Sequence, residues 1–236
     1  MEAHLASANN VIVEATLRET RETLVRWNRR PLRTIGSWLA LSLFIAVSML
    51  GAVLAVSHFA HAEFTTALPN IDHASHVADA ARVFFRNSLV LALHGFVCLA
   101  GFMAMRALPE QAKYKRGLDR WVHDHASRFA MVWVSCATVF SITTQTWILG
   151  HTVADLSLTL GLSQNTLLLT VLPHALIELT AVFLPLAAFL IASRLGRWHE
   201  LLAATIVTVS AAIPMLVIAG FVEAYVWPAL LRSVLS

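Results

Sequence analysis

Five long apolar runs separated by short polar segments dominate this chain. They cover residues 35–57, 87–107, 129–150, 165–193 and 201–227. Each run exceeds the length of about 18 apolar residues at which a membrane-spanning helix becomes a better interpretation than a buried core helix. The pattern therefore predicts an all-α membrane protein, a five-transmembrane-helix bundle.

The fourth run is interrupted by Pro173 and Pro185, which predict a tilted or kinked helix. Pro173 has no N–H to donate to the carbonyl of Leu169, so that backbone acceptor is left free inside the membrane. A kink there could open a cavity.

Basic residues in the flanks predict the orientation of the helices. Lys and Arg concentrate before the first run, between the second and third runs, and at Arg194 and Arg197 after the fourth, whereas residues 151–165 contain neither. Because Lys and Arg are enriched in cytoplasmic flanks, the N-terminus is predicted to be cytoplasmic and the C-terminus extracytoplasmic.

This topology divides the chain into two parts. Residues 1–34 form a cytoplasmic amphipathic and charged helix, and residues 35–230 form the transmembrane domain, with an outer loop at 58–86 and a cytoplasmic loop at 108–128. Within the outer loop, Asp72 is a plausible N-cap for an interfacial helix that lies along the membrane.

The composition agrees with a lipid environment. Of the 236 residues, 58% are hydrophobic and 13% are charged, and the basic residues behind the net charge of +3 fall beside the apolar runs. Topology therefore explains them, and nucleic acid is not an expected partner. Cys98 and Cys136 lie inside apolar runs, where a thiol behaves as a small hydrophobe.

Polar residues inside the predicted spans are the candidate functional residues, because ionisable groups in a membrane helix are costly and are by default functional hypotheses. The candidates for an outer-leaflet polar pocket are Asn87, His94, Gln145, His174, Glu178 and Glu223. Asn87 precedes His94 by seven residues and His174 precedes Glu178 by four, so each pair shares a helix face. These candidates come from four helices.

Three interpretations of this pocket are open. His174, Glu223 and Glu178 are candidate catalytic residues, because a carboxylate beside an imidazole can act as a general base. His94, His174 and Glu223 are candidate ligands for a divalent metal such as zinc. Alternatively, these residues hydrogen-bond one another and fix the helix packing.

Other motifs add little. Two H-x-x-H pairs in the outer loop, His58 with His61 and His73 with His76, are a further candidate zinc site. No G-x-S-x-G, H-E-x-x-H or Gly-rich phosphate loop occurs, so a soluble-type hydrolase or a nucleotide-binding activity has no support.

Three segments, at 84–96 (FFRNSLVLALHGF), 172–179 (LPHALIEL) and 216–228 (LVIAGFVEAYVWP), occur together in this order. Together they resemble the stage II sporulation protein M family of integral membrane proteins, over residues 35 to 230. The positions that match the family pattern are Asn87, Pro173, His174, Glu178, Glu223 and Pro228. Ala175 departs from it, because the family tends to have Gly there.

The resemblance implies a multi-pass protein of the bacterial cytoplasmic membrane. Family members are scaffolds in a complex that remodels peptidoglycan, and relatives help to mature or export circular bacteriocins. We therefore expect a non-enzymatic component of a cell-envelope complex that assembles with other envelope membrane proteins. The alternative is an intramembrane metal-dependent peptidase or a peptide-maturation or export factor with a peptide substrate. A homo-oligomer is also open.

Overall fold

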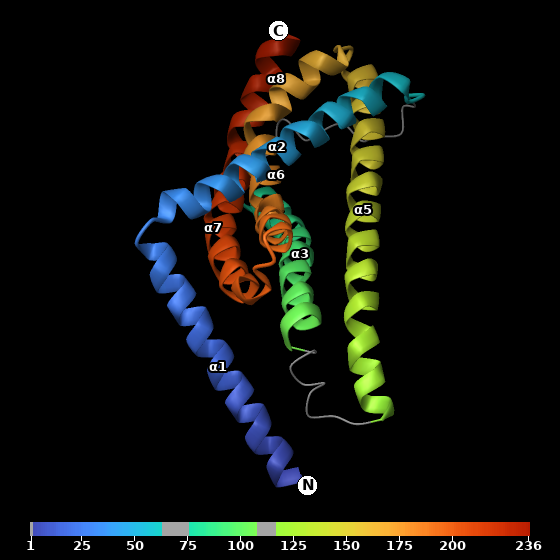
Figure 1. Cartoon of the computed structure of the whole chain (residues 1–236). Helices are drawn as coiled ribbons and strands as arrows, with labels where there is room; N and C mark the ends of the chain where they lie inside the picture. The colour runs from blue at the N-terminus through green and yellow to red at the C-terminus, as the bar shows by residue number, and fades with distance from the viewer. Residues whose placement is uncertain (1, 63–75, 108–116) are drawn as a thin grey trace.

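The computed structural model describes residues 2–62, 76–107 and 117–236, and the chain is almost entirely helical there (Figure 1). The elements are α1 (Glu2–Asn28), α2 (Pro31–Phe59), α3 (His76–Phe102), the π-helix η1 (Met103–Ala107), α5 (Leu118–Leu160), α6 (Gln164–Arg194), the 3₁₀-helix η2 (Trp198–Glu200), α7 (Leu201–Phe221), the π-helix η3 (Val222–Val226) and α8 (Trp227–Leu235). No strand occurs among the described residues.

Five helices in the described part of the chain are long and apolar enough to cross a membrane. They are Pro31–Phe59, Ala80–Arg106, Met131–Leu160, Gln164–Arg194 and Trp198–Leu235. The prediction of an all-α, five-span, multi-pass membrane protein is thereby confirmed. The orientation of the termini stays a prediction.

Helix α6 is the centre of the bundle. It packs against α2, α3 and α7, and 72% of its most apolar window is buried within the chain. Phe183 and Leu184 are neighbours in sequence and point in different directions, yet each is only 1% exposed. A helix that is apolar on all sides is expected in such a central place.

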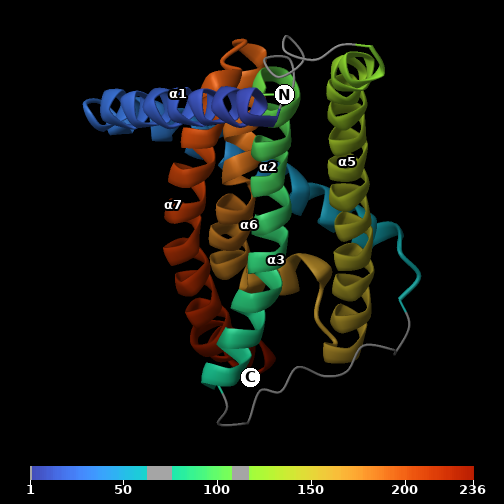
Figure 2. The ribbon, with the colours of Figure 1, turned by 90° about the horizontal axis from the view of Figure 1, so that it is seen from below.

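The first turns of α6 run at an angle to the rest of the helix, so its ribbon changes direction (Figures 1 and 2). The helix starts at a capped end, where the Ser163 hydroxyl accepts a hydrogen bond from the Thr166 N–H at 3.1 Å. Pro173 lies within the helix, and its ring and missing N–H are the expected cause of the bend. The predicted kink is present.

Helix α5 stands at the edge of the bundle and packs mainly against α2 (Figure 1). The two helices approach closely at Gly150, where an added Cβ would lie 2.4 Å from a methyl group of Val56 and 3.2 Å from the carbonyl oxygen of Val53. Only the absence of a side chain permits this approach.

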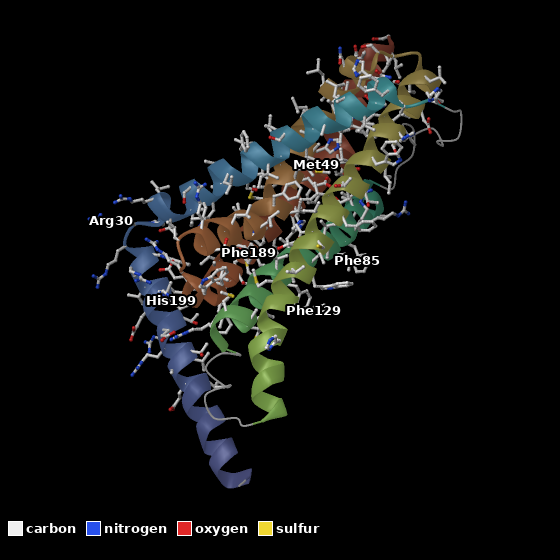
Figure 3. The ribbon with its side chains drawn as sticks, turned by 45° about the vertical axis from the view of Figure 1, so that its right-hand side comes forward. Arg30, Met49, Phe85, Phe129, Phe189 and His199 are labelled. Carbon is white, nitrogen blue, oxygen red and sulfur yellow. The ribbon has the colours of Figure 1, made fainter. Side chains whose placement is uncertain are left out.

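Helix α1 lies across one end of the bundle, at a steep angle to α3, α5 and α7 (Figure 2). Arg26 donates to Glu200 at 3.1 Å and Arg106 donates to Glu19 at 2.9 Å. His199 belongs to the same end of the molecule (Figure 3). The predicted N-terminal segment is thus helical, and its place at the inner surface stays a prediction. Helix α2 begins at Pro31 rather than at 35.

The segments between the spans contain more helix than their polar sequences suggest. Helix α5 begins at Leu118 and ends at Leu160, so part of the predicted loop 108–128 and most of the segment 151–165 are helical. Residues Val77–Phe85 form the first turns of α3, which continues directly into the second span as predicted. That these turns lie along the membrane stays a prediction. The proposed N-cap, Asp72, lies outside the described residues.

Candidate functional site

Polar side chains from α3, α6 and η3 meet near the end of the bundle that is opposite to α1. The Glu178 carboxylate lies close enough to interact electrostatically with Glu223 and Arg86, and it contacts the Asn87 side chain. His174, one turn before Glu178, lies near Arg86 as well. We refer to these five residues as the Glu178 cluster: Arg86, Asn87, His174, Glu178 and Glu223.

Two local features place Glu223 in this cluster. Gly220 lets α7 approach α3 closely, because an added Cβ would lie only 3.2 Å from the carbonyl oxygen of Ala80. Immediately afterwards the chain forms the π-helix η3, which contains Glu223. A π-helical turn inserts an extra residue into a helix and is frequent at functional sites.

Asn87 is buried at 4% exposure, and its side chain lies beside Glu178. Its Nδ2 has no hydrogen-bond partner among the described residues. The amide can therefore donate to a further group without giving up a strong internal hydrogen bond.

His174 is held by an aromatic contact. Its ring packs edge-on against Trp227 with a centroid distance of 6.2 Å, and the Trp227 indole N–H donates to the Thr170 hydroxyl at 3.2 Å. Nδ1 of His174 is buried and lacks a hydrogen-bond partner among the described residues. The imidazole is thus positioned with one ring nitrogen available.

His94 is not part of the Glu178 cluster. It is 1% exposed, its Nδ1 donates to the Val90 carbonyl at 3.0 Å, and its ring packs against Phe183 at 5.3 Å. These contacts place His94 in the apolar core, two helical turns along α3 from Asn87.

Gln145 also falls outside the cluster. Its amide donates to the Ser141 hydroxyl at 2.9 Å, within its own helix, α5. The predicted pocket drew polar residues from four helices, including the third span. In the structure the cluster residues come from α3, α6 and η3, and the indole of Trp227 from α8 packs against His174.

The three candidate metal ligands, His94, His174 and Glu223, do not come together, because His94 lies in the apolar core. Among the described residues, no group of three or more His, Cys, Asp or Glu side chains is arranged to hold a metal ion. His94, His174 and Glu223 therefore do not form a metal site in this structure. Among the H-x-x-H histidines, His58 lies in the last turn of α2, where its Nδ1 pairs with the Leu54 carbonyl at 2.8 Å. Residue 73 and the side chain of His76 lie outside the described part of the structure, so a zinc site on these two pairs stays a prediction.

Arg86 is the cluster residue that the sequence interpretation missed, because it was placed at the end of the outer loop 58–86. A signal was available. Basic residues are depleted in extracytoplasmic flanks, so an Arg directly before Asn87 on the predicted outer side requires a reason. The two nearby carboxylates supply that reason.

The Glu178 cluster combines two carboxylates, a guanidinium, an amide and an imidazole. Such a set can hold three helical elements together through charge-assisted hydrogen bonds, and it can also hydrogen-bond a polar substrate. No family model, no characterised protein and no solved structure matches this chain. The resemblance to the sporulation protein family accordingly stays a prediction.

Proposed function

We propose that this chain is an integral membrane component of a cell-envelope complex in a bacterial cytoplasmic membrane, where it assembles with other envelope membrane proteins. The proposed orientation has α1 in the cytoplasm and the Glu178 cluster near the outer face. The observation that carries the proposal is the incomplete packing of α5.

Helix α5 is the least apolar of the five spans and also the least buried. Only 6% of its most apolar window is buried within the chain, compared with 72% for α6. Ser and Thr are enriched where membrane helices pack against one another, so a span that is rich in them is expected to face protein. Hydroxyl and amide groups recur in this segment, at Ser135, Thr138, Ser141, Thr143, Thr144, Gln145 and Thr146.

One exposed face of α5 lies on the same side of the helix as its contact with α2. Positions 129, 136, 143 and 150 recur every seven residues and therefore lie on one side of the helix. Gly150 packs against α2, whereas Cys136 and Thr143 are exposed and Phe129 is 71% exposed (Figure 3). A transmembrane helix of a partner protein, packed beside α2, would cover this face. We call it the α5 docking face: Phe129, Cys136 and Thr143.

In this proposal the Glu178 cluster has a structural role. It ties α3, α6 and η3 together, and each interhelical polar contact in a membrane protein contributes about 0.6 kcal/mol. The rigid α3–α6–α7 core would then present α5 at its edge to the partner.

The proposal is tested by site-specific photo-crosslinking in cells of the native host. A photoreactive amino acid replaces Thr143 on α5. As a depth-matched control it replaces Phe44, which is 67% exposed in the middle of α2. We expect position 143 to yield a discrete adduct with an envelope membrane protein and position 44 to yield lipid adducts only. Depletion of the captured protein should reproduce the envelope defect caused by deleting this chain.

Two results would refute the proposal. Lipid adducts alone at both positions would show that α5 faces the bilayer. An adduct with a second copy of the chain would show that this face mediates a homo-oligomer rather than binding a partner protein.

The close approach of Glu178 to Glu223, with His174 one turn away, supports a second candidate function. In this alternative the cluster contacts a peptide during its maturation or export, with the carboxylates accepting hydrogen bonds from the peptide backbone. Glu178→Gln and Glu223→Gln variants should then lose maturation or export of the peptide while they keep the crosslink at position 143. Retained export in both variants would exclude this alternative.

A further inference from the structure

A second polar site lies between the C-terminal end of α2 and the last third of α5. It is an open pocket of 640 Å³, within the range of about 300–1,000 Å³ that is typical of small-molecule sites. Its lining residues are Ala55, Val56, Phe59, Ala60 and His61 from the α2 end, and Trp147, His151 and Asp155 from α5. None of them belongs to the Glu178 cluster or to the α5 docking face.

One wall of the pocket is polar and acceptor-rich. Asp155 is 9% exposed, and it interacts with another group of the chain. A carboxylate has about four lone-pair sites, so it can still accept from a ligand. The described residues of the lining include no Lys or Arg. The pocket therefore favours a ligand group that is cationic.

Two aromatic side chains extend this wall. The rings of Trp147 and His151 are in contact at a centroid distance of 4.6 Å, and the indole of Trp147 is 59% exposed. An indole face attracts an ammonium group through a cation–π interaction. The imidazole of His151 lines the same wall beside Trp147.

The opposite wall is apolar and lies near the membrane boundary. Val56 and Phe59 come from the last turns of a membrane-spanning helix, and Phe59 is 86% exposed. The last turn of a membrane-spanning helix lies at the level of the lipid head groups. A ligand here would have its polar end beside Asp155 and its apolar end directed into the bilayer.

We propose that this pocket binds the head group of an aminophospholipid, in the leaflet opposite to α1. The lipid ammonium contacts the Asp155 carboxylate, the Trp147 indole packs against the rest of the head group, and a lipid phosphate oxygen accepts from the exposed imidazole of His61. The first part of an acyl chain lies along Phe59. An anionic lipid without an amine, such as phosphatidylglycerol, lacks the group that this acceptor-rich wall selects.

The test is native mass spectrometry of the full chain released from nanodiscs that contain equal amounts of phosphatidylethanolamine and phosphatidylglycerol. We expect the wild-type chain to retain phosphatidylethanolamine preferentially. Asp155→Asn should reduce this preference about tenfold, which is the effect of losing one charge-assisted hydrogen bond. Thr152→Val is the matched control, because its exposed hydroxyl bonds only within α5, to the Ile148 carbonyl.

Trp147→Leu provides a second variant in case Asp155→Asn disturbs folding, since Trp147 is largely exposed. It should also lower the preference for phosphatidylethanolamine. Equal retention of the two lipids by the wild-type chain would show nonselective boundary lipid and overturn the proposal. An unchanged preference in folded Asp155→Asn and Trp147→Leu variants would overturn it as well. The crosslink at position 143 tests a different surface, so the two proposals can fail separately.

Discussion

The Glu178 cluster shows how single residues can reconcile charge with a membrane interior. Two carboxylates, Glu178 and Glu223, lie close enough to repel each other, and the Arg86 guanidinium lies within reach of Glu178. In a low-dielectric environment like charges are costly and opposite charges compensate them. Arg86 is itself exposed, so its contribution is smaller than that of a fully buried ion.

Replacing Arg86 by Met should destabilise the folded state, because it leaves the two carboxylates without this positive charge. We expect a loss of about 1 kcal/mol, which lowers the apparent Tm of the detergent-solubilised chain by about 2–4 °C. Adding Glu178→Gln to Arg86→Met should recover part of the loss, since the repulsion is then removed. Thermal unfolding of the single and double variants measures this coupling.

Arg232→Met is the control for Arg86→Met, because Arg232 is an exposed cation on α8 at the same end of the chain. It should leave the apparent Tm unchanged. Strictly additive effects of Arg86→Met and Glu178→Gln would mean that the two side chains are not coupled.

Among the helices, α5 depends on one close contact for its position. At Gly150 the backbone of α5 meets both the side chain of Val56 and the backbone of α2 at Val53. A backbone atom cannot move aside as the end of a flexible side chain can. Overpacking at such a site typically costs about 1–3 kcal/mol.

Gly150→Ala is therefore expected to lower the apparent Tm, whereas Gly51→Ala on α2 is expected to raise or preserve it. Nothing lies within 4 Å of a Cβ added at Gly51, and alanine is a better helix former than glycine by about 1 kcal/mol. The two variants thus make the same chemical change, but only Gly150→Ala is expected to lower the apparent Tm. Parallel thermal unfolding in one detergent checks the prediction, and equal shifts in both variants would contradict the close α2–α5 packing.

The molecule as a whole has two unlike ends. At one end α1 lies across the bundle, and Glu200, with 11% of its side chain exposed, accepts from Arg26 and lies within 4.0 Å of Arg197. At the other end lie the Glu178 cluster and the pocket between α2 and α5. Ion pairs at the first end dock α1, and because they are partly exposed, salt weakens them.

Glu200→Gln should loosen this docking and expose α1 to solvent. Hydrogen exchange of backbone amides in residues 13–28 should accelerate about fivefold, which corresponds to about 1 kcal/mol. Glu22→Gln is the matched control, because Glu22 pairs with Arg18 at 3.9 Å within α1 and both side chains are largely exposed. Equal exchange in the Glu200→Gln variant and the wild-type chain would show that apolar contacts alone hold α1.

Sequence alone determined the helices and their membrane character. A span is a local property, since about 20 apolar residues in a row satisfy their own backbone hydrogen bonds and dissolve in lipid whatever their neighbours are. The five spans were predictable for this reason, and the helix before them and the kink at Pro173 are likewise set by local sequence. The boundaries of α5 were not, because residues 118–128 and 151–160 are polar enough to resemble loops and yet continue the helix.

Only the tertiary structure decided which polar residues share a site. Helical spacing places His174 and Glu178 on one face of α6, but it contains no information about the rotation of α3 and η3 around α6. His94 turned into the apolar core beside Phe183, Gln145 stayed within α5, and Arg86 joined Glu178 from a segment interpreted as loop. These outcomes depend on the close approach at Gly220 and on the π-helical turn at Glu223, and such contacts between helices leave no periodic signal in the sequence.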